Sequence, residues 1–551
     1  MSKKIKITSL VLVLMGTIAA VAPPTDRHFE ILKNLDIFAT LFKEVNTHYV
    51  DEINPGTLLK SGIDEMLETL DPYTNYIAAD DIETYRIMTT GEYSGIGAVV
   101  ERKKGISTIV MPYEGFSAHN AGLRAGDEIH AINGTSLEGK SQEEVKYLMK
   151  GQSNSDVTLS IKRFGREGLF EVKVKREKIA VDSVPYAGMV TDDIGYVRLT
   201  SFTQNVGRSI GIKTLDLIEQ GAKKIILDLR GNPGGLLHEA VNVSNVFVEK
   251  GKKIVVQKGK VRANDWTYNT LNDPVDSNIP LVVLTDNGSA SASEIVSGVM
   301  QDYDRGVLIG RKTFGKGLVQ IERPLSYDAV VKITTAKYYT PTGRCIQAID
   351  YSNRNEDGSV GKIADSLKRE FKTANGRLVY DGGGIDPDVD VESLDFAPIT
   401  YSLMNKDLIF NYATEYYYKN DGKAPEAPND VRLSDTEYND FVEWLSDKEF
   451  DYTTTVEKKT EELISTAKEE KEYESLKKYF DDLAKASKHN KDQDLITFKE
   501  EIQMLLEQEL AGRYFLEKGI IESTFGKDPD VQTAVEVLNN PQRYNQILSG
   551  Q

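Results

Sequence analysis

Two side chains of this sequence have the surroundings that nucleophilic catalysis requires: a serine at a strand-to-helix turn and a lysine between two glycines. Ser291 follows the apolar run 279–284 and a stretch of small residues, and Glu294 three positions later is typical of a helix start. A hydroxyl at such a turn lies beside unpaired N–H groups and the positive end of a helix. Lys316 has glycine and apolar neighbours, so burial would keep its amine neutral and able to accept the serine proton.

Glycines at a second turn are candidates for stabilising an oxyanion. The apolar strand expected at 224–229 ends in a glycine-rich turn that opens a helix over 236–248. Glycine pairs at such a turn let backbone N–H groups face an anion, although a plain turn with positive φ has the same composition. We expect Gly234 or Gly235 to supply one donor and the N–H of Ala292 to supply the other.

A third set of motifs lies upstream and resembles a PDZ domain. The resemblance rests on the glycine-hinged stretch 93–100, the run 121–129 (Ala-Gly-Leu-Arg-Ala-Gly-Asp-Glu-Ile), a short amphipathic helix over 141–149 and a strand over 156–163. In PDZ domains the amides of the glycine loop bind the C-terminal carboxylate of a peptide, which adds a strand to the sheet. The resemblance assigns those amides to Gly95, Ile96 and Gly97, and it assigns the side-chain pocket to Val145, Leu148 and Met149. Ordinary core positions are an equal alternative for each of the last three.

Together these motifs resemble those of the C-terminal processing peptidases, also called tail-specific proteases, over about residues 28–392. In chain order the matching motifs are 70–73, the PDZ run, 228–235, 289–294, 315–317 with Gln320, 339–344 and 384–388. The resemblance implies a serine endopeptidase that recognises the C-terminal tails of protein substrates through its PDZ domain and cleaves or degrades them in the cell envelope. It assigns the nucleophile to Ser291, the base to Lys316, and the orientation of that lysine to Gln320.

The residue types agree with these roles. A free lysine titrates near pH 10.4, so a lysine base needs a pKa lowered by several units, and burial has that effect. The amide of Gln320 can accept a hydrogen bond from the amine without adding a charge, whereas an aspartate there would stabilise the ammonium ion. Positions 316 and 320 of a β-strand share one face, so we expect both side chains at one site.

Composition and cysteine content exclude several classes of function. The net charge of −18 argues against nucleic acids and anionic membrane surfaces as partners. Cys345 is the one cysteine, so an intrachain disulfide cannot form and a thiolate or zinc site is disfavoured. His48, His119 and His130 have no metal-ligand spacing, and His238 is better interpreted as a helix-surface residue than as part of a Ser-His-Asp triad. We therefore expect no metal and no cofactor.

The N-terminus has the pattern of a secretory signal. Lys3, Lys4 and Lys6 precede the uncharged stretch 7–22, which is short for a membrane span. Residues 20–22 fit a cleavage site, but Pro23 is unfavourable just after it, so an uncleaved membrane anchor is the alternative. We expect a protein exported to the bacterial periplasm, or anchored in the membrane and facing the periplasm.

The length of 551 residues predicts about three or four domains. We expect a multidomain α+β fold with N-terminal helices, a PDZ domain, a mixed α/β crotonase-like serine protease core and a C-terminal helical region. The expected boundaries are 1–22 for the signal peptide or anchor, 27–88 for the N-terminal helices, 89–176 for the PDZ domain, 177–399 for the protease core and 400–551 for the C-terminal helices. For this last region a solvated helical appendage is the main interpretation, and a dimerisation or substrate-gating module is the alternative.

Two functions of other classes remain open at this point. The chain could be a non-catalytic PDZ scaffold that binds peptide C-termini, although the presence of Ser291, Lys316 and Gln320 argues against this. It could also be a crotonase-like enzyme that acts on acyl thioesters, although the PDZ resemblance and the export signal argue against this. The partners that we expect are proteins or peptides with free C-termini and a second copy of this chain in a homodimer.

Overall fold

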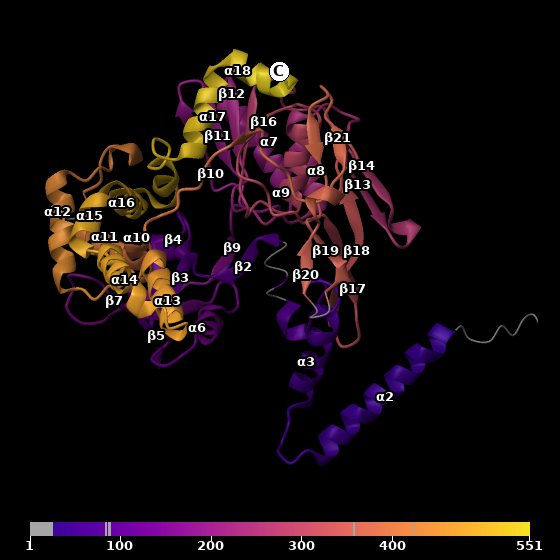
Figure 1. The fold of residues 1–551 in the computed structure, drawn as a ribbon, viewed down its shortest axis with the longest axis horizontal. Helices are drawn as coiled ribbons and strands as arrows, with labels where there is room; N and C mark the ends of the chain where they lie inside the picture. Colours follow the sequence, from indigo (N-terminus) through magenta and orange to yellow (C-terminus); the bar gives the residue numbers. More distant parts are fainter. Residues whose placement is uncertain (1–25, 83–84, 86–89, 356–358, 421–422, 551) are drawn as a thin grey trace, which may run out of the picture.

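The chain folds into a helical arm, two regions built on sheets and a C-terminal helical region (Figure 1). The computed structural model describes residues 26–82, 85, 90–355, 359–420 and 423–550. The expected signal segment 1–22 lies outside the described residues. Within them, no helix combines the length and the apolar character needed to cross a membrane.

The arm consists of α2 (Asp26–His48) and α3 (Pro55–Glu68), in the region where the sequence predicts N-terminal helices. The side chain of Asn54 accepts hydrogen bonds from the first turn of α3, and Pro55 at the first helical position supplies a suitable φ. No residue of α3 is buried, and both helices project from the rest of the molecule (Figure 1). The chain then returns to the body as β1 (Asn75–Ile77).

The next region contains the sheet and helix expected of a PDZ domain. Its strands are β2 (Glu92–Gly95), β3 (Ala98–Lys103), β4 (Ile106–Pro112), β5 (Glu128–Ile132), β6 (Thr135–Ser136), β7 (Asp156–Lys162), β8 (Phe170–Lys175) and β9 (Glu177–Ala180). Five of them form a sheet in the order β3-β4-β5-β7-β8, with β6 beside β5, while β2 pairs with β9. The short helix α5 (Ser117–Asn120) and the helix α6 (Gln142–Met149) complete the region, and a reciprocal pair of hydrogen bonds between Ser141 and Glu144 caps α6.

A six-stranded sheet forms the centre of the molecule. Its order is β10 (Tyr186–Thr191), β11 (Ile194–Arg198), β12 (Lys224–Asp228), β15 (Leu281–Thr285), β16 (Val307–Gly310) and β23 (Val389–Asp390), and only the β10–β11 pair is antiparallel. Successive residues of β12 and β15 enter two different cores, because alternate side chains point to opposite faces of a strand. Helices α7 (Val206–Glu219), α8 (Leu237–Phe247) and α9 (Ala292–Asp302) share the core of one face.

A second sheet carries the other half of the candidate site. It contains β1, β18 (Val330–Tyr339), β13 (Lys253–Gly259) and β14 (Trp266–Asn269), with β17 (Leu318–Pro324) also paired to β18. Two small hairpins follow, β19 (Ile349–Arg354) with β20 (Val360–Lys362) and β21 (Glu370–Lys372) with β22 (Leu378–Tyr380).

The C-terminal region is only partly a solvated appendage. Its helices are α10 (Pro398–Asn405), α11 (Leu408–Lys419), α12 (Asp435–Trp444), α13 (Thr455–Glu469), α14 (Tyr473–Ser487), α15 (Lys491–Thr497), α16 (Lys499–Glu522), α17 (Pro529–Asn539) and α18 (Pro541–Ser549). The hairpin α13–α14 fits the expectation, since only Thr460, Ala467 and Phe480 of it are buried.

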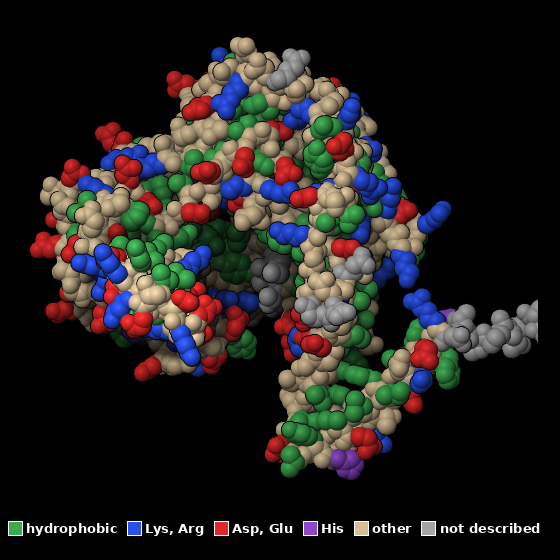
Figure 2. Space-filling model, viewed as in Figure 1, with side chains coloured by type: hydrophobic (Ala, Val, Ile, Leu, Met, Phe, Trp, Pro, Cys, Tyr) green, Lys and Arg blue, Asp and Glu red, His purple; other side chains and the backbone are tan. Residues whose placement is uncertain are grey.

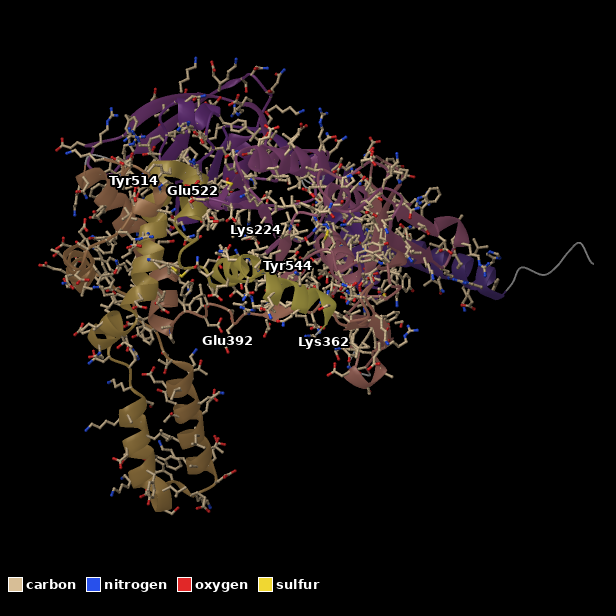
Figure 3. The ribbon with its side chains drawn as sticks, turned by 90° about the horizontal axis from the view of Figure 1, so that it is seen from above. Lys224, Lys362, Glu392, Tyr514, Glu522 and Tyr544 are labelled. Carbon is tan, nitrogen blue, oxygen red and sulfur yellow. The ribbon has the colours of Figure 1, made fainter. Side chains whose placement is uncertain are left out.

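The last two helices depart from that expectation. Val531, Ala534 and Val537 of α17 pack on the face of the central sheet opposite α9. The Leu281 N–H donates to the Tyr544 hydroxyl of α18 at 3.0 Å. Figure 3 labels Tyr544 on this last helix. The charged composition of residues 433–548 concealed this apolar face, because it is confined to one stripe of each helix.

Candidate active site

Ser291 occupies a strained turn between β15 and α9. It is the N-cap of α9, as predicted, and its φ of 56° and ψ of −109° lie where residues other than glycine are rare. Strain of this kind is typical of nucleophiles held at the tip of a strand-to-helix turn. The Ser291 N–H donates to the Glu294 carboxylate at 2.8 Å, and the Ser291 side chain makes no capping hydrogen bond, so its hydroxyl is not engaged by the helix.

The surroundings of Lys316 lower the pKa of its amine, which is the direction that the sequence predicts. The pKa of Lys316 is lowered from 10.5 to about 8, chiefly by burial and in addition by repulsion from Lys332. Attraction from Glu294 and Asp71 opposes both effects. The Lys316 Nζ lies 4.3 Å from the centre of the Tyr73 ring. A fraction of the amine is therefore deprotonated near neutral pH.

Two buried groups join the serine turn to the lysine segment. The Glu294 carboxylate, with no exposed surface, accepts from the N–H groups of Ser291, Gly315 and Lys316 at 2.8, 2.7 and 2.8 Å and from the Thr313 hydroxyl at 2.6 Å. Burial nevertheless raises the pKa of this carboxyl. The Tyr338 hydroxyl donates to the carbonyl oxygens of Lys316 and Ser291 at 2.6 and 3.0 Å.

Close packing explains the glycine before the lysine. Gly315 has a φ of +91°, and a β-carbon there would lie 2.4 Å from the Cβ of Ala348. A larger residue at this position would push the Lys316 segment away from the turn that holds it.

Gln320 reaches the site through a β-bulge rather than by simple alternation. Lys316 precedes β17, and the pairing of β17 with β18 skips Thr335 between Val319 and Gln320. The expectation that 316 and 320 share the face of one regular strand is therefore wrong in detail. Both side chains nevertheless line one cavity of about 350 Å³, together with Ser291, Gly234 and Gly235.

The two candidate oxyanion glycines differ in what their N–H groups bind. A β-carbon on Gly234 would lie 2.8 Å from the Ala292 nitrogen, so this loop touches the serine turn directly. The Gly234 N–H donates to the Asn232 side chain at 2.9 Å. Among the described residues, the N–H groups of Gly235 and Ala292 have no recorded acceptor. Gly235 is thus the better placed of the two glycines to donate to an oxyanion.

A second small cavity, of about 290 Å³, lies at the PDZ groove. Gly95, Ile96, Val145 and Met149 line it, together with Tyr93, Ala98, Val100 and Gln142. Two of the expected ligand-binding residues do not line it, since Leu148 is packed against the core of the region and Gly97 lies against Phe116. The groove is mainly apolar, as expected of a site for an apolar peptide end.

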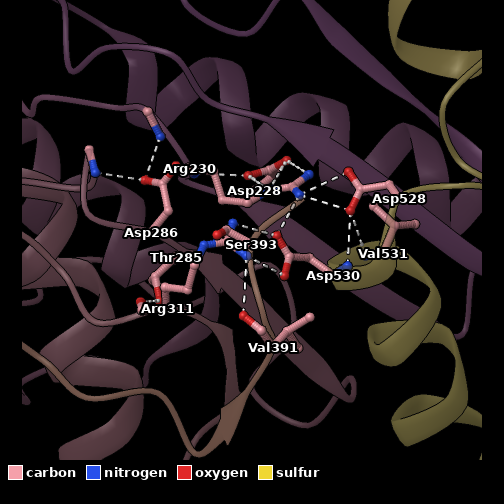
Figure 4. A network of polar contacts seen from close by, with 12 residues as sticks. Asp228, Arg230, Thr285, Asp286, Arg311, Val391, Ser393, Asp528, Asp530 and Val531 are labelled. Carbon is pink, nitrogen blue, oxygen red and sulfur yellow. Dashed lines mark hydrogen bonds and ion pairs between the residues drawn. The ribbon is translucent and has the colours of Figure 1, made fainter. Parts of the chain in front are cut away.

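An ion-pair network lies behind the glycine turn (Figure 4). Arg230, which precedes Gly231, bonds the buried Asp228 and reaches Asp528 and Asp530 near the start of α17. Burial opposes the charge of Asp228, but Arg230 and Arg198 hold the pKa of this carboxyl well below its usual range. The C-terminal helices are thereby bonded to the base of the loop that carries the candidate oxyanion donors.

Several residues that contribute to the site carry no distinctive sequence signal. Tyr338 and Lys332 lie in an ordinary alternating strand, and residues 70–73 are identified in the sequence only by their resemblance to a family motif. Of the residues set aside, His238 is exposed on α8 as predicted. In the part of the chain that the structure describes, no group of His, Cys, Asp and Glu side chains could hold a metal ion.

Three family models match parts of this chain. The model of peptidase family S41 matches residues 193–352, and that of the PDZ domain matches residues 108–163. A third, described as "Probable PDZ-protease, C-terminal helical domain", matches residues 399–538. The mixed α/β fold with a PDZ domain, a protease core and a C-terminal helical domain agrees with these three assignments.

Curated relatives from two organisms extend the similarity along the chain. The "Carboxy-terminal-processing protease" of Bartonella bacilliformis is 36% identical over 329 residues, which are 59% of this chain and 75% of that protein. The "Probable CtpA-like serine protease" of Staphylococcus aureus (strain MRSA252) is 32% identical over 419 residues, which are 75% of this chain and 82% of that protein.

Two solved structures also resemble parts of the chain. The photosystem II D1 C-terminal processing protease is 26% identical and covers 65% of this chain and 93% of its own, with a TM-score of 0.35. The PDZ domain of a carboxy-terminal protease from Vibrio cholerae, in complex with a peptide, is 27% identical and covers 16% of this chain and 99% of its own, with a TM-score of 0.16.

Proposed function

This chain belongs to peptidase family S41 and is a serine-type peptidase with a PDZ domain, and on that premise we propose that Ser291 and Lys316 form its catalytic dyad. The observation that carries the proposal is their shared cavity, which is lined by a strained serine turn and by a partly buried lysine whose pKa is lowered to about 8. Family membership argues against the non-catalytic scaffold and the acyl-thioester enzyme.

In the proposed mechanism the Ser291 oxygen attacks the carbonyl carbon of a peptide bond, and the neutral Lys316 amine takes the serine proton. The N–H groups of Ala292 and Gly235 stabilise the oxyanion that forms. The Lys316 ammonium then gives its proton to the leaving amine. In the second half of the reaction the Lys316 amine takes a proton from water, and the water oxygen attacks the acyl carbon. The ester bond to Ser291 then breaks, and Lys316 returns the proton to the serine oxygen. Gln320 orients the lysine through its amide.

We further propose that the substrates are proteins with free, apolar C-terminal tails. The amides near Gly95 and Ile96 would bind the terminal carboxylate, and Val145 and Met149 would contact the last side chain. A carboxylate held by several N–H groups contributes about 2–3 kcal/mol, which corresponds to roughly 30- to 150-fold in affinity. Gly97 and Leu148 would support this groove from behind.

The test of the dyad compares the wild-type chain with Ser291→Ala and Lys316→Ala on an unfolded protein substrate, with fragments identified by mass spectrometry. We expect both variants to remain folded and to lose cleavage, and the double variant to be no worse than either single one. Substantial cleavage by purified Lys316→Ala would exclude the lysine as the base.

The tail is tested with one substrate in two forms, a free acid and a C-terminal amide. We expect the amide to bind more weakly and to be cleaved more slowly at low substrate concentration. Equal rates for the two forms across a range of concentrations would exclude tail recognition by the PDZ region.

The finer organisation is also proposed. We place the boundaries at 22, 88, 176 and 399, and we assign the core to a crotonase-like architecture, which the parallel sheet with its glycine-turn site supports. Mass spectrometry of fragments from limited proteolysis tests the boundaries, because exposed linkers are cut before folded regions.

Export and assembly complete the proposal. We place the protein in the periplasm or on the membrane facing it, with residues 1–22 as a cleaved signal or an anchor. Sequencing the N-terminus of the protein from its native membrane and periplasmic fractions distinguishes these two cases.

We also propose a homodimer formed through the arm, whose α2 exposes many large apolar side chains (Figure 2). These are Phe29, Ile31, Leu32, Leu35, Ile37, Phe38 and Leu41.

A further inference from the structure

We propose that Asp71 and Thr334 are positioning residues that fix the direction of the Gln320 amide and thereby hold its oxygen available to Lys316. The inference rests on the proposed Ser291–Lys316 dyad and adds to it a chain of hydrogen bonds that begins in the segment after the arm. Asp71, Thr334 and Gln320 are called the relay below.

The relay is a continuous path of short contacts. The Gln320 Nε2 donates to the Thr334 hydroxyl at 3.1 Å, and that hydroxyl donates to the Asp71 Oδ1 at 3.1 Å. Asp71 is 7% exposed, and its Oδ1 also accepts from the N–H groups of Tyr73 and Thr74, both at 2.9 Å. The Thr74 hydroxyl donates to the Asp71 Oδ2 and accepts from the Thr334 N–H, each at 3.1 Å.

The polarity of this path has one consistent solution. A carboxylate only accepts hydrogen bonds, so the Thr334 hydroxyl must donate its single proton to Asp71. The Thr334 oxygen can then only accept, and Gln320 must present its NH₂ group to it. The Gln320 Oε1 is left as an acceptor in the cavity that Gln320 shares with Lys316. Among the described residues, neither this oxygen nor the Lys316 Nζ has a recorded hydrogen-bond partner.

The same segment covers the amine. Tyr73 follows Asp71 by two residues, its ring centre lies 4.3 Å from the Lys316 Nζ, and its ring packs edge-on against Tyr351 at 6.1 Å. The strand β1 follows at once and pairs with β18 at Asn75 and Lys332. The polypeptide between the arm and the PDZ region thus supplies one wall of the lysine environment and one end of the relay.

Two substitutions at one position separate a polar role from packing. Thr334→Val keeps the shape and removes the hydroxyl, so Gln320 is free to turn its amide. We expect kcat to fall by about 10-fold or more, with KM changed by less than about twofold. Thr334→Ser keeps the hydroxyl and loses only a methyl group, and we expect it to retain most of the activity.

The pH profile gives an independent readout. A carbonyl oxygen beside Lys316 favours the ammonium form, because it accepts a hydrogen bond from it. Loss of that oxygen in Thr334→Val should move the rise of kcat/KM to lower pH, and this variant leaves in place the Asp71 charge, which raises the pKa of Lys316 by itself. A loss of packing alone would lower the thermal midpoint without this displacement.

The matched control is Thr335→Val on the same strand. The Thr335 hydroxyl is buried and makes no hydrogen bond, and it lies at the bulge outside the relay, so kcat and the pH profile should stay as in the wild type. An unchanged kcat in Thr334→Val, or an equal loss of kcat in Thr334→Ser, would show that the relay does not position Gln320. If Lys316→Ala is inactive in the same series, the proposed dyad is unaffected by that result. Residual cleavage by Lys316→Ala in the same series would instead show that the dyad itself is wrong.

Discussion

Lys316 lies between a second lysine that repels its proton and two carboxylates that attract it. The charged groups that face it are Lys332 from β18, Glu294 from α9 and Asp71 from the segment before β1. Burial is the larger effect, and Lys332, itself partly buried with a lowered pKa, adds to it. The lowered pKa of Lys316, about 8, therefore results from desolvation together with a neighbouring charge of the same sign.

Removing the second lysine should raise the pKa of the first. We expect Lys332→Met to move the rise of kcat/KM with pH above its wild-type position near pH 8, because the repulsion that disfavours the Lys316 ammonium is lost. The matched control is Lys337→Met, which removes the same charge from an exposed position of the same strand. A profile that moves equally in both variants would assign the effect to net charge rather than to proximity.

At the scale of elements, the start of α17 is fixed to the catalytic core by buried ion pairs. Asp530 is 1% exposed and accepts from Arg230 at 2.8 Å and from Arg311 at 3.0 and 2.8 Å (Figure 4). Breaking a buried pair by removing one partner leaves an uncompensated charge, which typically costs about 3–5 kcal/mol.

We therefore expect Asp530→Ala to lower the urea midpoint of the core clearly and to lower kcat, because Arg230 leads directly into the turn at Gly231. An exposed ion pair provides the comparison, since Asp435 pairs with Lys499 at the surface of the C-terminal helices. Asp435→Ala should leave both the midpoint and kcat unchanged. Equal midpoints for the two variants would show that the α17 contact contributes nothing to stability.

The sequence predicts the helices and strands that have a local pattern of apolar or capping residues, and it misses the contacts between these elements. The strands at 224–229 and 281–284 and the helix cap at Ser291 are local patterns, and the structure has them within a residue or so. The bulge at Thr335 depends on the pairing of two strands, and the packing of α17 on the sheet depends on a stripe hidden in a charged segment.

The residues of the candidate site also fall into those that local patterns predict and those that depend on contacts between elements. Ser291, Lys316 and Gln320 follow from short motifs, and the structure brings them to one cavity. The contributions of Lys332 and Tyr338 are tertiary, because neither residue differs in type or spacing from its neighbours in β18. The choice between Gly234 and Gly235 likewise needed the Asn232 side chain, which lies out of reach of any local pattern.

At the scale of the whole molecule, the arm is the part whose apolar side chains the rest of the described chain does not cover. The helix α2 has 23 residues and is about 35 Å long, and its large apolar side chains are exposed although the rest of the chain has ordinary cores (Figure 2). A two-fold pairing with the arm of a second copy would cover the same face on both chains.

The assembly is tested by light scattering on the chain that starts at residue 26. We expect a dimer for the wild type and a monomer for the double variant Leu32→Glu with Phe38→Glu. Lys33→Glu, which introduces the same residue at a polar position of α2, should stay dimeric. A wild-type monomer at all practical concentrations would exclude pairing through the arm.

The Glu294 carboxylate has a consequence for how the site opens and closes. It holds the amide hydrogens of Ser291, Gly315 and Lys316, which belong to two segments that approach each other only in the folded chain. Amides that share one buried acceptor are released by one opening event, so these three should exchange with deuterium at a common opening free energy. Ser291 and Lys316, the proposed nucleophile and base, would then be lost and recovered together, and a partly assembled site with one of them in place would hardly be populated.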